Sequence, residues 1–523
     1  MIGEVHALGR SPRSPLNFCF EKKPSLRREP AQNQIALPLP MQATDEAPPS
    51  SQFHSDADRS ANDGPRRAAV YRALSNYKTA RDRTGATFTD WKSARAAAST
   101  IKHEAVNNLD KYLEQFERNF TARGGKVFWA NDSRQARDYI LNLAKEKNVK
   151  AIVKSKAMTG EEIHLNDALV AAGFGVVESD LGEFIQQLKG EAPYHFVFPC
   201  MHLRRDEISD LFNRELGTAK TNSPEELTMI ARKVLRRTYI EADMGISGGN
   251  FIVADAGMIS ITENEGNARL TVGVPRIHVA LVGIEKVVPR LGDLALLLPM
   301  LATAGTGQHL TGYNSMYGGP RQPGENDGPE EFHVVLLDNH RTRLLADPEQ
   351  RDALHCIRCG ACLNVCPIFK NIGGHSYGTT YQGPIGSVIT PHFRGLQDWK
   401  HLSGASSLCG ACTETCPVGI DIHHHLLRNR RNAATQRPTP LESLMWKAFS
   451  FLMRRPRLYS FATRIAPLAA KLHPLVQGTL ADPVRAWTST RDFPEPAPES
   501  FRMQFKRHQS NRESQINSTN IPH

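Results

Sequence analysis

The sequence lacks any long hydrophobic run. Its best candidate, residues 279–301, is interrupted by Glu285, Lys286, Arg290 and Asp293. A transmembrane helix needs about 20 consecutive, predominantly apolar residues, so we expect none in this chain. The first 50 residues also lack the apolar core of a secretory signal peptide. We therefore predict a cytoplasmic protein.

Strong charge of one sign is also missing. The chain has 64 Lys and Arg residues against 54 Asp and Glu residues, a net charge of +10 over 523 residues. Neither a helix-turn-helix pattern nor a basic stripe interleaved with aromatic residues accompanies this mild excess. We therefore expect no nucleic-acid partner, and a redox-sensing nucleic-acid binder is the least supported class of function.

A glycine-rich dinucleotide loop is absent as well. The nearest pattern, Gly245-x-x-Gly248-Gly249 with Gly257 beyond it, lacks the G-x-G-x-x-G spacing that follows a strand in such loops. We interpret these glycines as turn residues. The sequence therefore offers no flavin or nicotinamide site.

What the sequence does have is a cluster of cysteines, seven of its nine within 61 residues. Disulfide scaffolds are short secreted chains that are rich in cysteine throughout, so this clustering predicts metal binding instead. Of the other two cysteines, Cys200 ends an apolar strand and we expect a buried thiol there. Cys19 lies in the N-terminal tail.

The clustered cysteines form two motifs. The first motif reads Cys356-x2-Cys359-x2-Cys362-x3-Cys366-Pro367. This is the spacing of two-cluster ferredoxins, in which three thiolates bind one cluster and the fourth reaches the other. The second motif aligns with it without a gap and reads Cys409-x2-Cys412-x3-Cys416-Pro417. Ser406 stands where the first motif has Cys356, so this internal repeat has one ligand missing.

Crossed ligation then predicts two iron–sulfur clusters of the [4Fe–4S] type. The first takes Cys356, Cys359, Cys362 and Cys416, and the second takes Cys366, Cys409 and Cys412. The alternative is zinc, which needs four tetrahedral ligands and typically pairs two Cys-x2-Cys knuckles. A third cysteine at the same spacing, a fourth at x3 and a following proline, all repeated, favour iron–sulfur. Such a module moves one electron at a time between a donor and an acceptor.

The chain divides into five segments. Residues 1–65 are rich in proline without an apolar period, which predicts a disordered tail. Residues 66–345 alternate strands and helices, which predicts an α/β domain with a mostly parallel sheet. Residues 346–432 are expected to form an α-helical two-cluster ferredoxin domain. Basic amphipathic helices follow in residues 433–480, and a second disordered tail in residues 481–523.

Local patterns position elements within the α/β domain. Thr159-x-x-Glu162 is a capping box that opens a helix, and Ser223 followed by Pro224 begins another. The spacing of apolar residues predicts one continuous helix over residues 101–116. Ala256-Gly257 predicts a hairpin turn, and residues 196–198 predict a strand.

Five segments carry a resemblance to a known family. They are residues 154–163 (KSKAMTGEEI), 241–250, 264–267 (NEGN), 328–333 (GPEEFH) and 356–417. In these segments the sequence resembles the lactate utilization protein B family of bacteria, over roughly residues 70–475. The resemblance implies an N-terminal lactate-utilisation domain, similar to the ribose-phosphate-isomerase and CoA-transferase fold, and then a two-cluster ferredoxin domain.

The resemblance also implies a function. Members of that family work with two partner proteins, one of them a cysteine-rich iron–sulfur protein, to oxidise L-lactate to pyruvate. It implies cluster ligands at the seven cysteines already assigned, including a second site of three cysteines, so that Ser406 is a family trait. We therefore expect the electron-transfer subunit of an L-lactate oxidation complex, with no catalytic residue assigned.

The alternative is a self-contained enzyme. Polar residues stand at strand ends or turns of the α/β domain, where parallel sheets commonly bind ligands. They are Lys154, Ser155, Glu161, Glu162, Glu241, Asn264, Glu265 and Glu285. A small acid or a phosphorylated ligand would bind there, and an open iron of the second cluster would act as a Lewis acid. The plainer interpretation makes these residues caps and solvated turns, and His423-His424-His425 a solvated helix face.

The C-terminal segment mixes basic and apolar residues. Its four arginines Arg454, Arg455, Arg457 and Arg464 flank Phe449, Phe451, Leu452, Leu458 and Phe461. A helix with this mixture suits an anionic membrane surface or a partner protein. An electron acceptor at the inner face of the membrane agrees with that interpretation. The alternative is that the apolar face packs on the ferredoxin domain.

Overall fold

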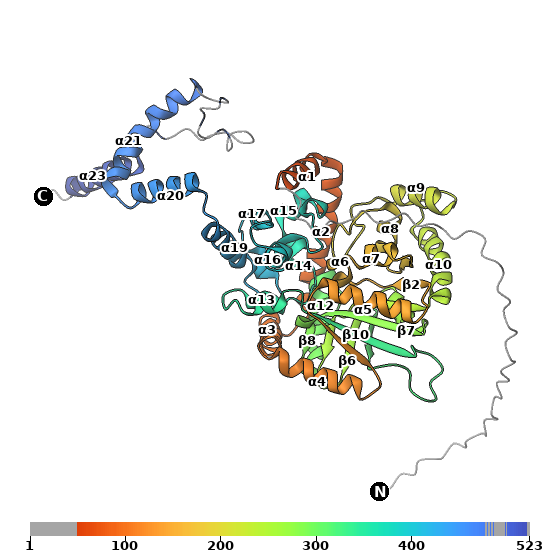
Figure 1. Cartoon of the computed structure of the whole chain (residues 1–523). Coiled ribbons are helices and arrows are strands. Elements are labelled where there is room, and N and C mark those ends of the chain that lie inside the picture. The colour runs from red at the N-terminus through yellow and green to blue at the C-terminus, as the bar shows by residue number, and fades with distance from the viewer. Residues whose placement is uncertain are drawn as a thin grey trace, which may run out of the picture.

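The structure is a computed structural model that describes residues 50–475 and 499–519, together with Thr479, Asp482, Arg485 and Ala497. An α/β body adjoins a helical domain that carries the cysteines, and three C-terminal helices stand apart from both (Figure 1). Most of the N-terminal tail predicted for residues 1–65 lies outside the described residues, as does part of the tail predicted for residues 481–523.

The core of the α/β domain is a parallel sheet of six strands, as the alternation of strands and helices predicts. Its strands lie in the order β1-β10-β7-β4-β2-β3. Their bounds are β1 Lys126–Ala130, β10 Glu331–Leu337, β7 Ile277–Gly283, β4 Met244–Ser247, β2 Ala151–Lys154 and β3 Gly175–Glu178. All of the pairings in this sheet are parallel, and the carboxyl ends of the strands therefore share one edge.

Helices cover both faces of this sheet. Val279 and Leu281 of β7 pack with Ile140 of α5 (Ser133–Glu146). Ala280 and Val282 point the other way and join a core cluster built by α4 (Leu109–Thr121). Because successive side chains alternate between the faces, β7 is buried throughout, and its one polar side chain, His278, bonds Ser247 at 2.8 Å. The remaining helices of the domain are α6 Met158–Glu162, α7 Leu165–Ala171, α8 Leu181–Lys189, α9 Arg205–Leu216, α10 Pro224–Glu241 and α11 Asn267–Gly273.

A second, smaller sheet lies beside the first. It has the order β8-β5-β6-β9, with bounds β8 Val287–Val288, β5 Phe251–Val253, β6 Met258–Glu263 and β9 Tyr313–Tyr317. β5 and β6 are antiparallel, which confirms the hairpin predicted at Ala256-Gly257. Gly257 has φ +56° and leaves no room for a Cβ, which would lie 2.6 Å from the backbone of Asn119.

The described chain begins with two helices, and the first of them corrects a prediction. α1 (Ser50–Asn62) lies within the segment predicted to be disordered, and α2 (Gly64–Gly85) follows it. Phe53 of α1 is buried, with its ring 6.3 Å from that of Tyr377 and 5.3 Å from that of His401. Local composition could not reveal this helix, because its apolar contact comes from the cysteine domain.

Three further local predictions are wrong. The helix expected over residues 101–116 is broken at Asn108 (φ −133°), which separates α3 (Trp91–Asn107) from α4. Thr159 and Glu162 form no capping box: the Thr159 hydroxyl donates to the Leu281 carbonyl, and Glu162 pairs with Arg341. Residues 196–198 form bends rather than a strand. The N-cap at Ser223 is confirmed, since its side chain accepts from the Glu226 amide.

The cysteine domain is helical, as predicted. Its helices are α14 Ala361–Val365, α15 Pro367–Ile372, α16 Gly383–Arg394, α17 Lys400–Gly404, α18 Ala411–Thr415 and α19 Ile422–Gln436. Two helices that precede it in the chain are α12 Leu294–Thr306 and α13 Arg341–Leu345. One hydrophobic cluster joins Leu297 and Met300 of α12 to Leu363 and Val388 of the cysteine domain. The two domains therefore share a core.

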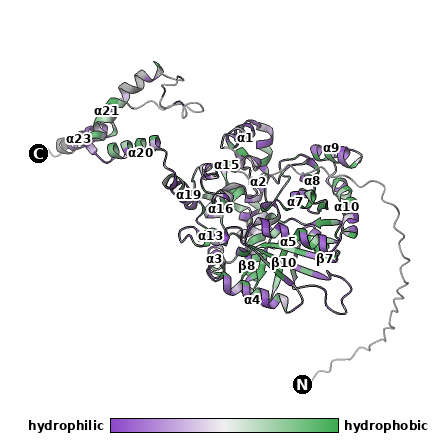
Figure 2. Ribbon diagram, in the orientation of Figure 1, coloured by the Kyte–Doolittle hydropathy of each residue, from purple (hydrophilic) through white to green (hydrophobic). Residues whose placement is uncertain are grey.

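The C-terminal helices correct two more predictions. α20 (Pro440–Met453) has no buried residue, so its apolar face does not pack on the ferredoxin domain. It leads into α21 (Pro456–Leu472), and both helices stand away from the body (Figures 1 and 2). α23 (Phe501–Thr519) occupies a segment predicted to be disordered. None of the helices in the described ranges is long and apolar enough to cross a membrane.

Candidate iron–sulfur site

The first cysteine loop is a tight turn followed by a short helix. Arg358 (φ +59°) and Gly360 (φ +79°) adopt left-handed conformations that fold the chain back between Cys356 and Cys362. α14 begins at Ala361, and the Arg358 amide donates to Cys356 Sγ at 3.4 Å. The turn therefore gathers its three thiols on the inside of the loop.

The second loop repeats this backbone. Leu408 (φ +54°) and Gly410 (φ +81°) take the places of Arg358 and Gly360, and α18 has the same length as α14. The Leu408 amide donates to Ser406 Oγ at 3.1 Å. Ser406 thus makes the hydrogen bond that Cys356 makes in the first loop, with its oxygen in the place of the thiol.

Four thiols meet in one small, apolar cavity. Cys356, Cys359 and Cys362 line it together with Cys416, which comes from the end of the second loop. Burial, and then the neighbouring thiols Cys356 and Cys416, raise the pKa of Cys359 to about 12. Burial likewise raises the pKa of Cys416 to about 11. Such a group of buried thiols becomes anionic when a metal replaces its protons.

The charges around this cavity fit an anionic cluster. Lys102 is buried beside Cys356, where Arg358 and the partly buried Lys286 also lie, and burial lowers the pKa of Lys102 to about 7 and that of Lys286 to about 8. Nε and Nη1 of Arg358 are buried and have no acceptor among the described residues. An iron–sulfur cluster with its thiolates supplies negative charge for these cations and acceptors for the two Arg358 nitrogens.

The other three cysteines form a second group. Burial raises the pKa of Cys366, with a further contribution from Cys409, and burial followed by Cys366 raises that of Cys412 to about 12. Cys409 is exposed, in contrast to the four thiols of the first group. The buried Tyr377 hydroxyl, whose pKa burial and Cys366 raise, has no hydrogen-bond partner among the described residues. This group also fits a cluster, with three thiols and the Ser406 oxygen in the ligand positions of the repeat.

A buried ion-pair network ties the first loop to the α/β domain. Arg341 donates to Glu162 at 2.7 and 2.9 Å and to Glu285 at 2.5 Å. Arg358 reaches the other oxygen of Glu285 at 3.3 Å, and the Tyr381 hydroxyl donates to Glu162 at 2.7 Å. Burial opposes the charge of Glu285, but Arg341 and Arg358 lower its pKa to about 2. Glu162 and Glu285 therefore join the domains.

The other polar residues singled out in the sequence are dispersed. Buried Lys154 contacts Glu161 at 3.0 Å and Glu178 at 2.7 Å. Ser155 is buried and donates its amide to Ile246, and Glu241 pairs with Arg237 on the surface. Glu265 accepts from the Leu181 amide, and burial raises its pKa to about 7. Asn264 bonds Gln308. These eight residues do not form one site.

The histidine run does not form a wholly solvated face. His425 is buried, with Nε2 2.9 Å from a carboxylate oxygen of Asp352. His423 joins α18 to α19 through Thr413 Oγ1 at 2.7 Å, and exposed His424 contacts Asp421. The prediction of a solvated face failed because the side of α19 that carries His423 and His425 packs on α16 and α18.

Sequence reasoning missed the cations of the site. Lys102, Lys286 and Arg341 lie outside the cysteine motifs, and the topology of the α/β domain brings them to the first loop. Arg358 could have been predicted from the sequence as a residue near the cluster, because it stands between two predicted ligands, Cys356 and Cys359. Cys200, predicted to be buried, is partly exposed, and burial raises its pKa to about 11.

Comparisons with known proteins agree with this division of the chain. The LUD domain profile matches residues 113–337, a 4Fe-4S dicluster domain profile matches residues 352–420, and the lactate utilisation protein B C-terminal profile matches residues 424–510. Lactate utilization protein B from Shouchella clausii is 42% identical over 87% of this chain and 97% of its own length. The protein of the same name from Bacillus velezensis is 43% identical over 84% of this chain and 93% of its own. A crystal structure of a DUF162 family protein from Deinococcus radiodurans matches with TM-score 0.26 and 11% identity, over 44% of this chain and 98% of that one.

Proposed function

Because the chain belongs to the lactate utilization protein B family, we propose that it is the electron-transfer subunit of a complex that oxidises L-lactate to pyruvate. A role in lactate utilisation follows from the family, and the dicluster domain brings iron–sulfur clusters. The observation that supports this more specific proposal is that two sets of cysteine thiols lie side by side, built by two copies of the same loop. Two adjacent one-electron carriers suit transfer through the protein.

We propose the ligands of each cluster as follows. Cys356, Cys359, Cys362 and Cys416 hold the first cluster, which the shared cavity supports. Cys366, Cys409 and Cys412 hold the second, which their mutual effects on pKa support. The clusters accept and donate single electrons. The chain itself supplies the buried cations around the first group, the exposed edge at Cys409 and the oxygen of Ser406.

The two groups lie next to each other. Burial raises the pKa of Cys362 well above its usual value, and the contributing neighbours include Cys412 of the second group as well as Cys356 and Cys359 of the first. An electron at one group is therefore close to the other. The exposure of Cys409 makes the second group the nearer one to an external donor or acceptor.

We further propose that two other lactate-utilisation proteins, one cysteine-rich and carrying iron–sulfur, exchange electrons with this chain. The test is anaerobic reduction of the purified protein by L-lactate, followed by its visible and electron paramagnetic resonance spectra. Reduction that requires both partners supports the subunit role. Reduction by lactate without partners would instead support the self-contained enzyme, with a ligand in the α/β domain and an open iron.

The C-terminal helices supply a surface for such an exchange. Large apolar side chains of α20 and α21 are exposed: Leu441, Leu444, Met445, Trp446, Phe449, Phe451, Met453, Leu458 and Phe461. Arginines accompany them, which suits the anionic inner face of a membrane that holds the electron acceptor. Co-sedimentation with anionic vesicles at low salt tests this, and absence of binding there would assign the surface to a protein partner.

We also propose that the α/β domain resembles the ribose-phosphate-isomerase and CoA-transferase fold.

A further inference from the structure

A cavity of about 730 Å³ lies between the α/β domain and the cysteine domain. Its α/β wall includes Glu178, the last residue of β3, and Glu161, which pairs with Lys154 at the end of β2. Segment 370–382, which follows Cys366, forms the opposite wall, and α1 contributes a third side. The volume and the position at the carboxyl ends of parallel strands are those of a ligand site.

The walls of this cavity carry buried oxygen atoms that lack hydrogen-bond partners among the described residues. They are Asn166 Oδ1, Glu178 Oε2, both carboxyl oxygens of Glu183, Gln186 Oε1 and Gln382 Oε1. The amide orientations are fixed, because Nε2 of Gln186 donates to the Pro199 carbonyl and Nε2 of Gln382 to the Pro193 carbonyl. Burial raises the pKa of Glu183 well above its usual value, so its carboxyl carries a proton and can donate. Unsatisfied buried polar atoms are costly, so whatever occupies this cavity forms hydrogen bonds with them.

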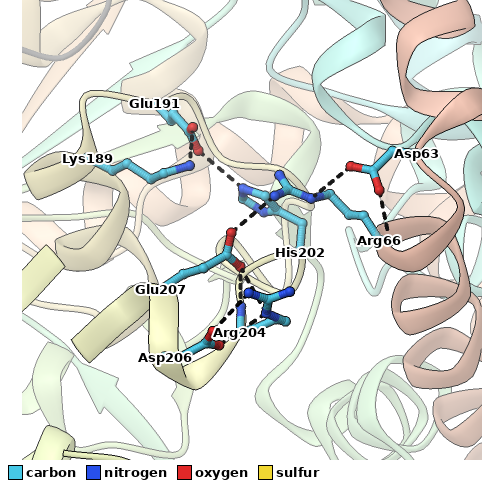
Figure 3. A network of polar contacts seen from close by, with 8 residues as sticks. All are labelled: Asp63, Arg66, Lys189, Glu191, His202, Arg204, Asp206 and Glu207. Atoms are coloured by element: carbon cyan, nitrogen blue, oxygen red, sulfur yellow. Dashed lines mark hydrogen bonds and ion pairs between the residues drawn. The ribbon is translucent and has the colours of Figure 1, made fainter. Parts of the chain in front are cut away.

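Three metal-ligating side chains meet at this wall. Ligand atoms of Glu191, His202 and His375 all lie within 4.8 Å of one another. Figure 3 shows Glu191 and His202 pointing toward each other, with their Oε2 and Nε2 atoms 3.2 Å apart. That separation is close to the roughly 3.3 Å between two ligand atoms of a tetrahedral ion with bonds of about 2.05 Å.

The surroundings of His375 are those of a metal ligand. His375 Nε2 lies 2.8 Å from the Ala192 carbonyl, which can only accept, so this nitrogen carries the proton and Nδ1 is free of one. A ligating histidine commonly donates its other nitrogen to a backbone carbonyl in this way. His202 is 4% exposed, and its Nδ1 has no partner among the described residues. Its ring stacks on Tyr194, with the ring centroids 4.5 Å apart.

The protonation states at neutral pH leave these ligands ready for a cation. Burial lowers the pKa of His202 to about 4 and also lowers that of His375. Burial opposes the charge of Glu191, but the hydrogen bonds from His202 and Lys189 outweigh it and lower the pKa to about 2. Two neutral imidazoles and one carboxylate therefore face each other, and a metal at His202 Nε2 requires only that the proton which this nitrogen donates to Glu191 moves to Nδ1, which has no partner among the described residues.

We propose that Glu191, His202 and His375 bind one divalent transition-metal ion, separate from the iron–sulfur clusters, with its remaining coordination positions open to the cavity. Two histidines and one carboxylate are the ligand set of open zinc and ferrous sites. No cysteine is among the described residues that line this cavity.

One neighbouring cation competes with the metal. The Lys189 ammonium contacts the second oxygen of Glu191 (Figure 3). Lys189 is partly exposed, so its ammonium can turn into solvent when a divalent ion binds the Glu191 carboxylate. Arg66, also in Figure 3, is already paired with Glu207 at 3.2 Å and Asp63 at 3.4 Å. Removing the charge of Lys189 is therefore expected to tighten metal binding.

Equilibrium dialysis of the full chain with its clusters, without oxygen and against Zn²⁺, tests the site. Zinc, iron and sulfide are counted in the same samples, and we expect one zinc per chain with iron unchanged. His375→Gln, on the accessible side of the site, should weaken zinc binding by about 100-fold or more. Lys189→Gln should tighten it by about tenfold, an effect that a purely structural role for these residues would not produce.

The matched control is His424→Gln. Asp421, His423 and His424 are the other group of described residues that meets the same geometric condition, and it is more exposed. Zinc that survives His375→Gln but is lost in His424→Gln would overturn the proposal. It would also fail if no zinc bound, if zinc entered only as iron left, or if Lys189→Gln left the affinity unchanged.

Discussion

The two cysteine loops have the same backbone but different surroundings. Both turn through a left-handed residue and a left-handed glycine into a five-residue helix. In the first loop, cationic side chains lie beside the thiols. In the second loop, arginine side chains instead donate hydrogen bonds to the backbone carbonyls. Arg95 donates to Cys416 O and Thr413 O at 2.7 Å each, and Arg430 donates to Ser406 O at 3.1 Å. The duplicated loop therefore fixes the ligand geometry, while the packing around each copy sets its charge and exposure.

The largest expected effect on cluster content comes from replacing Cys416, which lies far along the chain from the other three cysteines of the first group. Cys416→Ser removes the fourth thiol of the first cavity, although Cys416 belongs to the second loop. We expect loss of the first cluster, with the iron count falling toward that of one cluster. Cys200→Ser, outside both thiol groups, should keep both. Loss of the Cys409 and Cys412 cluster alone would show that ligation is not crossed.

The ion-pair network offers the next test, because it holds the first loop and not the second. Arg341→Met leaves Glu162 and Glu285 buried without their main partner, which costs about 3–5 kcal/mol of unfolding free energy. In the wild type the folded pKa of Glu285, about 2, lies below its unfolded value, so its stabilisation is present at pH 7 and lost as pH falls toward 2.

The pH dependence separates this effect from a simple loss of packing. Without Arg341, burial raises the pKa of these carboxyls above the unfolded value, so the folded variant takes up protons first. Its stability deficit should therefore shrink between pH 7 and pH 5. Urea unfolding at both pH values measures this, with Arg237→Met, which removes the exposed partner of Glu241, as the control. A deficit that does not change with pH would contradict the electrostatic account.

Ser406→Cys removes the difference in ligands between the loops. The proposed ligation leaves one iron of the second cluster without a cysteine thiolate from the repeat, and oxygen ligands suit a cubane less well than thiolates. We expect the second cluster to be lost first in air, through a three-iron form, and the variant to retain a four-iron signal for longer. Paramagnetic resonance during timed exposure to air measures both. Equal oxygen stability of the two wild-type clusters would refute this asymmetry.

The sequence could predict the features that adjacent residues determine, but not those that depend on contacts between distant parts of the chain. Spacing alone predicted the repeat and placed Ser406 correctly, because a loop of this kind is determined by adjacent residues. The parallel sheet and the hairpin at Ala256-Gly257 were predictable from periodicity and turn residues. The network of Arg341 was not, since it joins residues far apart in the chain. The helix of Phe53 was missed for the same reason.

The smallest expected effect tests whether the cations distinguish the two clusters. Arg358→Gln removes a buried positive charge beside Cys356. A cation stabilises the more negative, reduced form, so the reduction potential of the first cluster should fall, on the order of 50 mV, or about 1 kcal/mol for one electron. Arg358→Lys keeps the charge and should shift the potential less. Lys370→Gln, beside Cys366, should instead lower the potential of the second cluster. A redox titration followed by paramagnetic resonance resolves the two potentials, and equal shifts of both clusters in each variant would mean that the local charge does not tune them separately.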